Sequence, residues 1–181
     1  MSAVPDPDVA RRFELLVMPH LNAGYNLARW LTRNEHDAED LVQEAYLRAF
    51  RSFDGYRGGD PRAWLLKIVR NACYTWLRQR RDGLVEVAAA DDPPAEVADD
   101  PAAGPEAQVI RRADSVLLRR ALEELPLEFR EALILRELEG LSYKEIAEVA
   151  GVPLGTVMSR LARGRKQLQV ALQRGMGGTE P

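Results

Sequence analysis

Apolar side chains recur at helical spacing through the N-terminal half of the chain. Residues 11–34 carry this rhythm, and Pro19 is expected to interrupt it. A second helix is predicted over 35–53, and after the turn-rich stretch 54–60, Pro61 can open a third helix that runs to about Arg81. The second helix has an apolar stripe at steps of three and four, formed by Leu41, Val42, Ala45, Tyr46, Ala49, Phe50 and Phe53. These segments predict a small helical bundle.

The segment 83–109 has a different composition. Alanine, proline and acidic residues dominate it, it contains no aromatic residue, and the helical periodicity is lost. Such a composition is typical of a flexible, self-repelling linker. Helical rhythm returns at about residue 110 and continues to about 173. The sequence therefore predicts an all-α fold class, with two small helical domains at 10–82 and 110–174, a flexible acidic linker at 83–109 and a tail at 175–181.

Charge is arranged in blocks, although the net charge is only −3. Residues 62–81 include six basic and no acidic residues, and 150–178 include five basic and no acidic residues. Between them, residues 82–110 include eight acidic and no basic residues. Electrostatic binding to phosphate depends on the local cluster, so the acidic total does not argue against nucleic-acid binding.

The C-terminal half contains a helix-turn-helix pattern. Ser142 and Glu145 have the spacing of a capping box, and Gly151 can adopt the positive φ that ends a short helix. Pro153 can begin a second helix, which carries polar and basic residues on its outer face. A plain helical hairpin with a solvated basic face is the weaker interpretation, because four separate signals agree. A helix-turn-helix by itself names no function.

The helix predicted over 61–81 mixes aromatic and basic residues. Aromatic rings stack on unpaired bases while arginine and lysine hold the phosphate backbone, so this mixture suits single-stranded or melting DNA. Core packing is the alternative, and we prefer it for Trp64. Tyr74 and Trp76 do not share one helical face, so at least one of them is expected to be more exposed.

These motifs occur in an order that closely resembles the sigma-70 family of bacterial initiation factors. DAEDLVQEAYLRAF is followed by FDGYRGGDPRAWLLKIVRNACYTWLRQRR, a variable linker, and LEELPLEFREALILRELEGLSYKEIAEVAGVPLGTVMSRLARGRKQL. The resemblance covers nearly all of residues 10–173 and is to the extracytoplasmic-function (ECF) group, which keeps only regions 2 and 4. It implies a monomeric alternative sigma factor that binds core RNA polymerase, recognises the −35 and −10 promoter elements and helps open the duplex.

The resemblance also assigns residues to each interface. The expected contacts with the polymerase β′ clamp are Asp40, Gln43, Glu44 and Arg48. The expected contacts with the −10 strand are Asn71, which would help to hold an extruded base, and Tyr74, Arg78, Arg80 and Arg81. The expected −35 contacts are Thr156, Met158, Ser159, Arg160 and Arg163. The β flap and an anti-sigma factor are further expected partners.

Two features depart from the family or leave a choice open. The residue before Ser159 is often basic in this family, whereas here it is Met158, which suits an apolar contact such as a thymine methyl. The acidic linker either imitates nucleic acid in a polymerase channel or is only a solvated tether. Both interpretations of the linker carry equal weight.

Other function classes fit less well. His20 and His36 are isolated, and the carboxylates of 37–44 have no companion metal-binding motif, so we expect no enzyme activity and no cofactor. One cysteine, Cys73, and the lack of a secretory signal or membrane-length apolar run favour a cytoplasmic protein. A helix-turn-helix regulator that binds duplex DNA alone is the serious alternative, but it would not need the aromatic and basic helix. A protein that only sequesters a partner would not need the second basic block.

Overall fold

The computed structural model describes residues 6–83 and 104–178, and every regular element in these ranges is helical. The elements are α1 (Pro7–Val17), η1 (Met18–His20), α2 (Leu21–Thr32), α3 (Glu35–Ser52), η2 (Phe53–Gly55), α4 (Pro61–Arg81), α5 (Pro105–Glu123), α6 (Leu127–Leu133), η3 (Ile134–Leu138), α7 (Tyr143–Ala150) and α8 (Leu154–Gly177). The predicted all-α class is confirmed. Most of the predicted linker lies outside the described residues, and the first five residues of α5, 105–109, fall within it.

The N-terminal bundle, α1 to α4, surrounds a cluster of aromatic rings. Phe13 of α1 is fully buried and meets Tyr46, Phe50 and Phe53 edge to face, with ring centroids 5.1 to 5.3 Å apart. A 3₁₀ turn separates α1 from α2 where Pro19 was expected to interrupt the helix. The apolar stripe of the predicted second helix thus supplies much of this core.

Helix α4 packs against both α2 and α3 of the N-terminal bundle and carries basic residues. Asp60 caps it by accepting a hydrogen bond from the backbone N–H of Arg62 at 2.9 Å, and Pro61 is its first residue, as the sequence predicted. A Cβ added at Gly24 of α2 would lie 3.2 Å from Cγ2 of Val69. This glycine therefore allows α2 and α4 to pack closely.

The C-terminal bundle, α5 to α8, contains the predicted helix-turn-helix in α7 and α8. Ser142 and Glu145 form both hydrogen bonds of the capping box, at 3.1 and 2.7 Å. Gly151 ends α7 with φ of 66°, as expected. Gly164 lets α8 approach α6, since an added Cβ would lie 3.3 Å from Cβ of Phe129. Helix α8, the second helix of the helix-turn-helix, therefore packs closely on α6.

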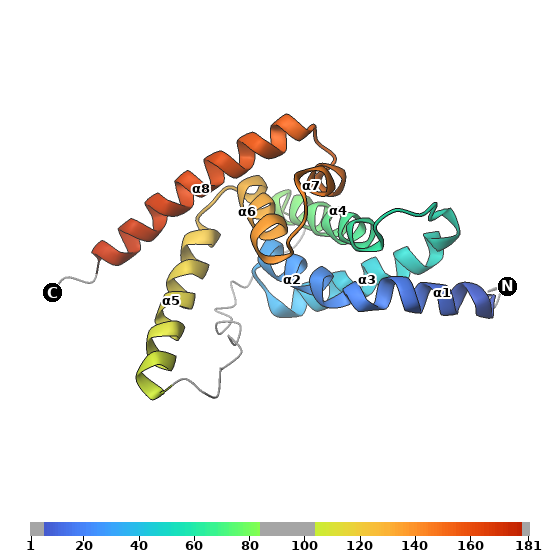
Figure 1. Ribbon diagram of the computed structural model, residues 1–181, viewed down its shortest axis with the longest axis horizontal. Coiled ribbons are helices and arrows are strands. Elements are labelled where there is room, and N and C mark those ends of the chain that lie inside the picture. Colours follow the sequence, from blue (N-terminus) through green and yellow to red (C-terminus); the bar gives the residue numbers. More distant parts are fainter. Residues whose placement is uncertain (1–5, 84–103, 179–181) are drawn as a thin grey trace.

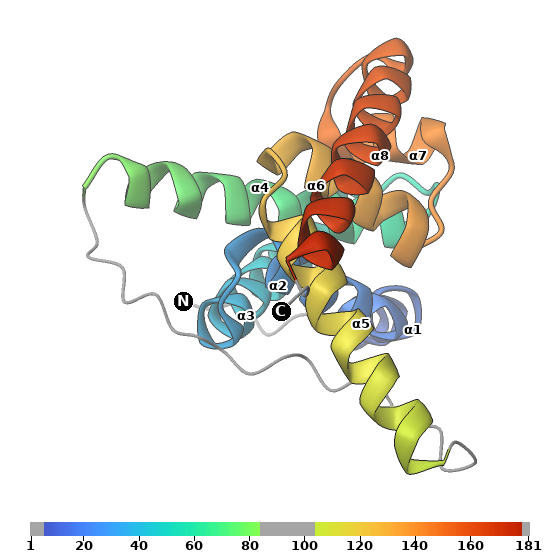
Figure 2. The same cartoon turned by 90° about the vertical axis from the view of Figure 1, so that its left-hand side faces the viewer.

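The two bundles pack against each other, which the sequence did not predict. Helices α6 and α7 lie against α2 and α4 (Figure 1), and the buried apolar residues of both bundles form one continuous cluster. The N-terminal half of α5 projects away from this body (Figure 2). Within the two described ranges, no helix combines the length and apolarity needed to cross a bilayer.

Candidate nucleic-acid and protein interfaces

The acidic start of α3 forms an exposed polar face. Asn34 caps the helix by accepting from the backbone N–H of Asp37 at 2.9 Å, and Glu35 and Asp37 lie in the first turn, where they favour the helix dipole. Two turns further along, Glu44 accepts from Arg48 at 2.7 Å in an exposed i,i+4 pair. Asp40, Gln43, Glu44 and Arg48, the predicted clamp contacts, are all exposed on this helix.

An apolar groove runs beside these polar residues and was not predicted from the sequence. It has a volume of about 460 Å³ and is lined by Met18, Leu21, Val42, Gln43, Tyr46 and Leu47. Met18 and Leu47 are 43% and 52% exposed, and they lie together in this groove rather than singly on the surface. Leu47 lies off the core-facing stripe of α3, and that is the signal in the sequence that could have revealed it. Gln43 therefore joins a polar face to an apolar groove.

The outer face of α4 is an open basic stripe. Asn71, Arg78 and Arg81 are exposed on it, as the assignment to the −10 strand requires. Lys67 and Thr75, one turn before and one turn after Asn71, are also exposed and were not singled out by the sequence reasoning. Their spacing of four from Asn71 could have identified them.

Arg80 is mostly buried and contacts other residues of the N-terminal bundle. Its Nη1 donates to Oδ2 of Asp37 at 3.0 Å, and its guanidinium carbon lies 4.1 Å from the ring centroid of Trp76. The side chain is 12% exposed. In this conformation Arg80 connects α4 to the start of α3, while Trp76 is half-buried beneath it.

Tyr74 faces the C-terminal bundle. Its hydroxyl donates to Oε2 of Glu131 at 2.6 Å, and the guanidinium carbon of Arg70 lies 3.6 Å from the centre of its ring. Burial and the charge of Glu131 raise the pKa of Tyr74. The ring that the sequence assigned to the −10 strand is therefore occupied by a contact between the two bundles.

The neighbouring thiol gives a testable pH dependence. Burial, and to a lesser extent the charge of Glu131, raise the pKa of Cys73 from 9.0 to about 12. The folded state keeps this proton while the unfolded state loses it above pH 9, so the stabilising contribution is present below pH 9 and falls between pH 9 and 12. From pH 8 to 10 the contribution of this thiol to the free energy of unfolding should fall by about 1.4 kcal/mol, measured as the difference between wild type and Cys73→Ala in urea denaturation. Cys73→Ala should remove most of this fall, and an equal fall in that variant would contradict the assignment.

Helix α8 presents its polar residues outward at the N-terminal end. Met158 is 53% exposed, Ser159 and Arg163 are exposed, and Thr156 and Arg160 are half-buried. Ser159 donates from Oγ to the carbonyl of Thr156 at 3.1 Å. The structure adds one exposed residue that the sequence reasoning missed, Leu154 in the first turn. This face is therefore open to a nucleic-acid groove.

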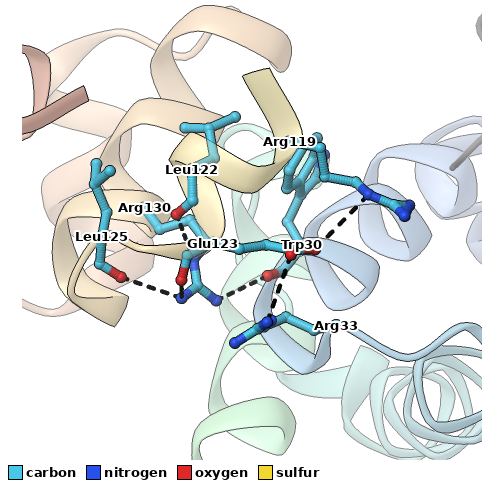
Figure 3. A network of polar contacts seen from close by, with 7 residues as sticks. All are labelled: Trp30, Arg33, Arg119, Leu122, Glu123, Leu125 and Arg130. Atoms are coloured by element: carbon cyan, nitrogen blue, oxygen red, sulfur yellow. Dashed lines mark hydrogen bonds and ion pairs between the residues drawn. The ribbon is translucent and has the colours of Figure 1, made fainter. Parts of the chain in front are cut away.

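A buried arginine fixes α6 to both bundles (Figure 3). Arg130 is 6% exposed and donates to the carbonyls of Leu122, Glu123 and Leu125 at 3.1 Å each, which satisfies the end of α5. It also donates to the carbonyl of Trp30 in α2 at 3.2 Å. Burial, and then the charge of Arg33, lower the pKa of Arg130. One side chain thus joins α5, α6 and α2.

Comparison with known families covers both bundles. Residues 16–82 match the family described as Sigma-70 region 2, and residues 115–168 match Sigma-70, region 4. The ECF RNA polymerase sigma factor SigE of Mycolicibacterium smegmatis is 41% identical over 92% of this chain. The RNA polymerase sigma-H factor of Pseudomonas aeruginosa is 34% identical over 90% of this chain. The chain spans 64% of the first relative's length and 87% of the second's.

The chain belongs to the ECF group of the sigma-70 family. A solved structure of the sigma factor RpoE with the anti-sigma factor NepR from Bartonella quintana is 29% identical, with a TM-score of 0.69 over 93% of this chain and 98% of that chain. CnrH in complex with the cytosolic domain of CnrY gives a TM-score of 0.63 at 26% identity, over 91% of this chain and 90% of that chain. Hence the N-terminal bundle corresponds to region 2 and the C-terminal bundle to region 4 of an ECF sigma factor.

Proposed function

We propose that this ECF sigma factor binds core RNA polymerase and directs promoter-specific initiation as an alternative sigma factor. The observation that carries the proposal is the presence in one chain of three separate open faces: the polar face and groove of α3, the basic stripe of α4 and the outer face of α8. A duplex-binding regulator would need the third face alone. The chain performs no covalent chemistry under this proposal, because its task is to bind and position polymerase and DNA.

Core polymerase is assigned to α3. Asp40, Gln43, Glu44 and Arg48 supply exposed polar groups, and the neighbouring groove offers apolar area that would be buried on docking. An acidic face repels DNA but suits a protein partner. The β′ clamp is therefore the partner that we assign to this face.

Region 4 is assigned both DNA and a second polymerase contact. The outer face of α8 would enter the major groove at the −35 element. The β flap is assigned to a groove of about 690 Å³ between α5 and α8, which is lined by Glu124, Leu125, Lys166, Gln167, Val170, Ala171 and Arg174. Val170 is 46% exposed in it and gives the flap an apolar contact. An anti-sigma factor is proposed as a further partner, since the solved relatives RpoE and CnrH are found with NepR and CnrY.

The domain division is likewise a proposal. It places region 2 at 10–82, the linker at 83–109 and region 4 at 110–174. The match to region 2 ends at residue 82, and the match to region 4 lies at 115–168, which supports these limits. Helix α5 already begins at Pro105, so the helical part of the second domain extends into the assigned linker.

Run-off transcription tests the proposed function. Purified core polymerase and this chain would be mixed with a panel of promoter sequences, with core polymerase alone as the control. A transcript that depends on both the chain and a particular promoter is the expected result. No dependent transcript from any promoter, together with stable sequence-specific duplex binding by the chain alone, would support the helix-turn-helix regulator instead.

Arg160 tests the assignment of α8. Replacing Arg160 with alanine is expected to weaken initiation from a −35-dependent promoter by about tenfold, because one arginine contact to base or phosphate is lost. Core binding, measured by fluorescence anisotropy without DNA, should not change. Arg120→Ala is the matched control, because this exposed arginine lies on α5, away from the outer face of α8 and outside the groove assigned to the β flap. Equal loss of core binding in Arg160→Ala would show that the residue has a different role.

A further inference from the structure

The contact between Glu131 and α4 is a charged pair buried between two domains. Glu131 of α6 is 1% exposed, and Arg70 donates from Nε to its Oε1 at 2.7 Å while Tyr74 donates to its Oε2 at 2.6 Å. Burying a carboxylate is costly unless it is paired and hydrogen-bonded, and here both of its oxygens have a donor. Burial by itself would lower the pKa of Arg70, but the hydrogen bond and charge of Glu131 raise it. The raised pKa keeps the Arg70 guanidinium charged, and both carboxylate oxygens of Glu131 are hydrogen-bonded.

The two donors have the chemistry of an anion site. A guanidinium and a phenol hydroxyl, placed to reach two oxygens of one group, can bind a phosphodiester in the same way as a carboxylate. Backbone phosphates also accept hydrogen bonds from tyrosine and arginine without regard to base sequence. Glu131 therefore presents to α4 the same charge and the same two-oxygen geometry that a phosphate would present.

The surroundings of this site lie on the face assigned to the −10 strand. Arg70 Nη1 also donates to Oδ1 of Asn71 at 3.5 Å, and Asn71 is exposed on the open stripe. Lys67 precedes and Arg78 follows on the same stripe. A strand held along these residues would pass within reach of the Arg70 and Tyr74 side chains once region 4 moved away.

We propose that Arg70 and Tyr74 form a binding site for a backbone phosphate of the unpaired −10 strand, and that Glu131 of region 4 occupies this site in the free chain. The inference rests on the proposed function, because it takes the assignment of α4 to that strand as given. Region 4 and single-stranded DNA then compete for the same donors. The apparent affinity for the strand equals the intrinsic affinity multiplied by the fraction of molecules in which Glu131 is displaced.

Other contacts between the two bundles stabilise the arrangement in which Glu131 contacts Arg70 and Tyr74. Arg62 of α4 donates from Nη1 to the carbonyl of Glu139 at 2.8 Å, and Arg130 donates to the carbonyl of Trp30. Neither of these uses a charged acceptor, whereas Glu131 meets Arg70 with full opposite charge. Removing the charge of Glu131 is therefore the change that most directly frees the proposed site.

Binding of single-stranded DNA to the full chain, without polymerase, tests the proposal. The probe is a fluorescein-labelled 12-nucleotide strand of mixed sequence, followed by anisotropy at fixed salt, because phosphate contacts do not depend on sequence. Glu131→Gln is expected to bind at least tenfold more tightly than wild type. Glu148→Gln makes the same change of charge at an exposed position on α7 and should bind within twofold of wild type. Equal gains in these two variants would overturn the proposal.

The identity of the site is tested in the Glu131→Gln background. Arg70→Gln and Tyr74→Phe should each remove most of the gain, and a strand with neutral methylphosphonate linkages should not show it. A gain that persists in both double variants would also overturn the proposal. Circular dichroism and thermal unfolding check that each variant is folded. If Glu131→Gln does not fold, Glu131→Asp replaces it, because aspartate keeps the charge but has a shorter side chain. Glu131→Asp is expected to give a smaller gain in affinity for the strand than Glu131→Gln.

The outcome is separable from that of the proposed function. A promoter-dependent transcript in the run-off assay combined with no gain for Glu131→Gln overturns the occupied phosphate site alone. A gain that depends on Arg70 and Tyr74 supports the site even where no promoter of the panel is transcribed.

Discussion

Replacing Arg130 with alanine is expected to lower the free energy of unfolding by about 3 kcal/mol or more. The guanidinium is buried and donates to four carbonyls, three at the end of α5 and one in α2. Truncation removes one charged donor from four carbonyls in a place where water reaches them poorly, and each lost hydrogen bond costs roughly 1 kcal/mol. Urea denaturation followed by circular dichroism would measure the loss.

Arg33→Ala is the matched control for this prediction. Arg33 meets the same helix end, through Oε2 of Glu123 at 3.4 Å, but its side chain is 53% exposed. Exposed ion pairs contribute about 0 to 1 kcal/mol, so this variant should change stability little. Arg130→Lys keeps the charge but lacks the planar fork, and it should restore only part of the loss. A similar small effect for Arg130→Ala and Arg33→Ala would show that the network in Figure 3 does not stabilise the fold.

Arg130 also shows what the sequence could and could not predict. Helical periodicity, the capping box at Ser142 and the positive φ of Gly151 depend on neighbouring residues, so they could be predicted from local patterns. The partners of Arg130 include Trp30, one hundred positions earlier in the chain. A contact at that separation leaves no periodic signal in one sequence. The packing of region 4 on region 2 was missed for the same reason.

Some features of the candidate sites could likewise be predicted from the sequence, and others could not. The exposed faces of α3 and α8 could be predicted, because helix geometry decides which residues share a face. Tyr74 was assigned correctly to the basic and aromatic helix, but nothing local indicates that its hydroxyl meets Glu131. Leu47 could have been singled out because it lies off the apolar stripe of α3, but only the three-dimensional fold shows that it lines a groove together with Met18 from another element.

Replacing Gln43 and Glu44 together with alanine is expected to reduce affinity for core polymerase by about 2 kcal/mol, or roughly 30-fold. Gln43 forms part of the groove beside Met18 and Leu47, so it lies where an interface would be most desolvated. Glu44 holds Arg48 at 2.7 Å, and its loss removes one polar anchor and frees the other. Both residues are exposed in a helix interior, where alanine is the best helix former, so the fold should be retained.

A second double variant makes the core-binding measurement specific. Gln79→Ala with Asp82→Ala removes one amide and one carboxylate from exposed positions at the end of α4, away from the groove. Measured by anisotropy with labelled core polymerase and no DNA, this control should bind as wild type does. Leu47→Ala adds a separate test, because it truncates an exposed apolar side chain of the groove without changing charge. If Leu47→Ala and the Gln43→Ala, Glu44→Ala double variant each lose affinity for core polymerase at unchanged thermal stability, the groove and the polar face form one docking surface. Wild-type affinity in all of them would mean that the acidic face of α3 serves only to start the helix and support the bundle.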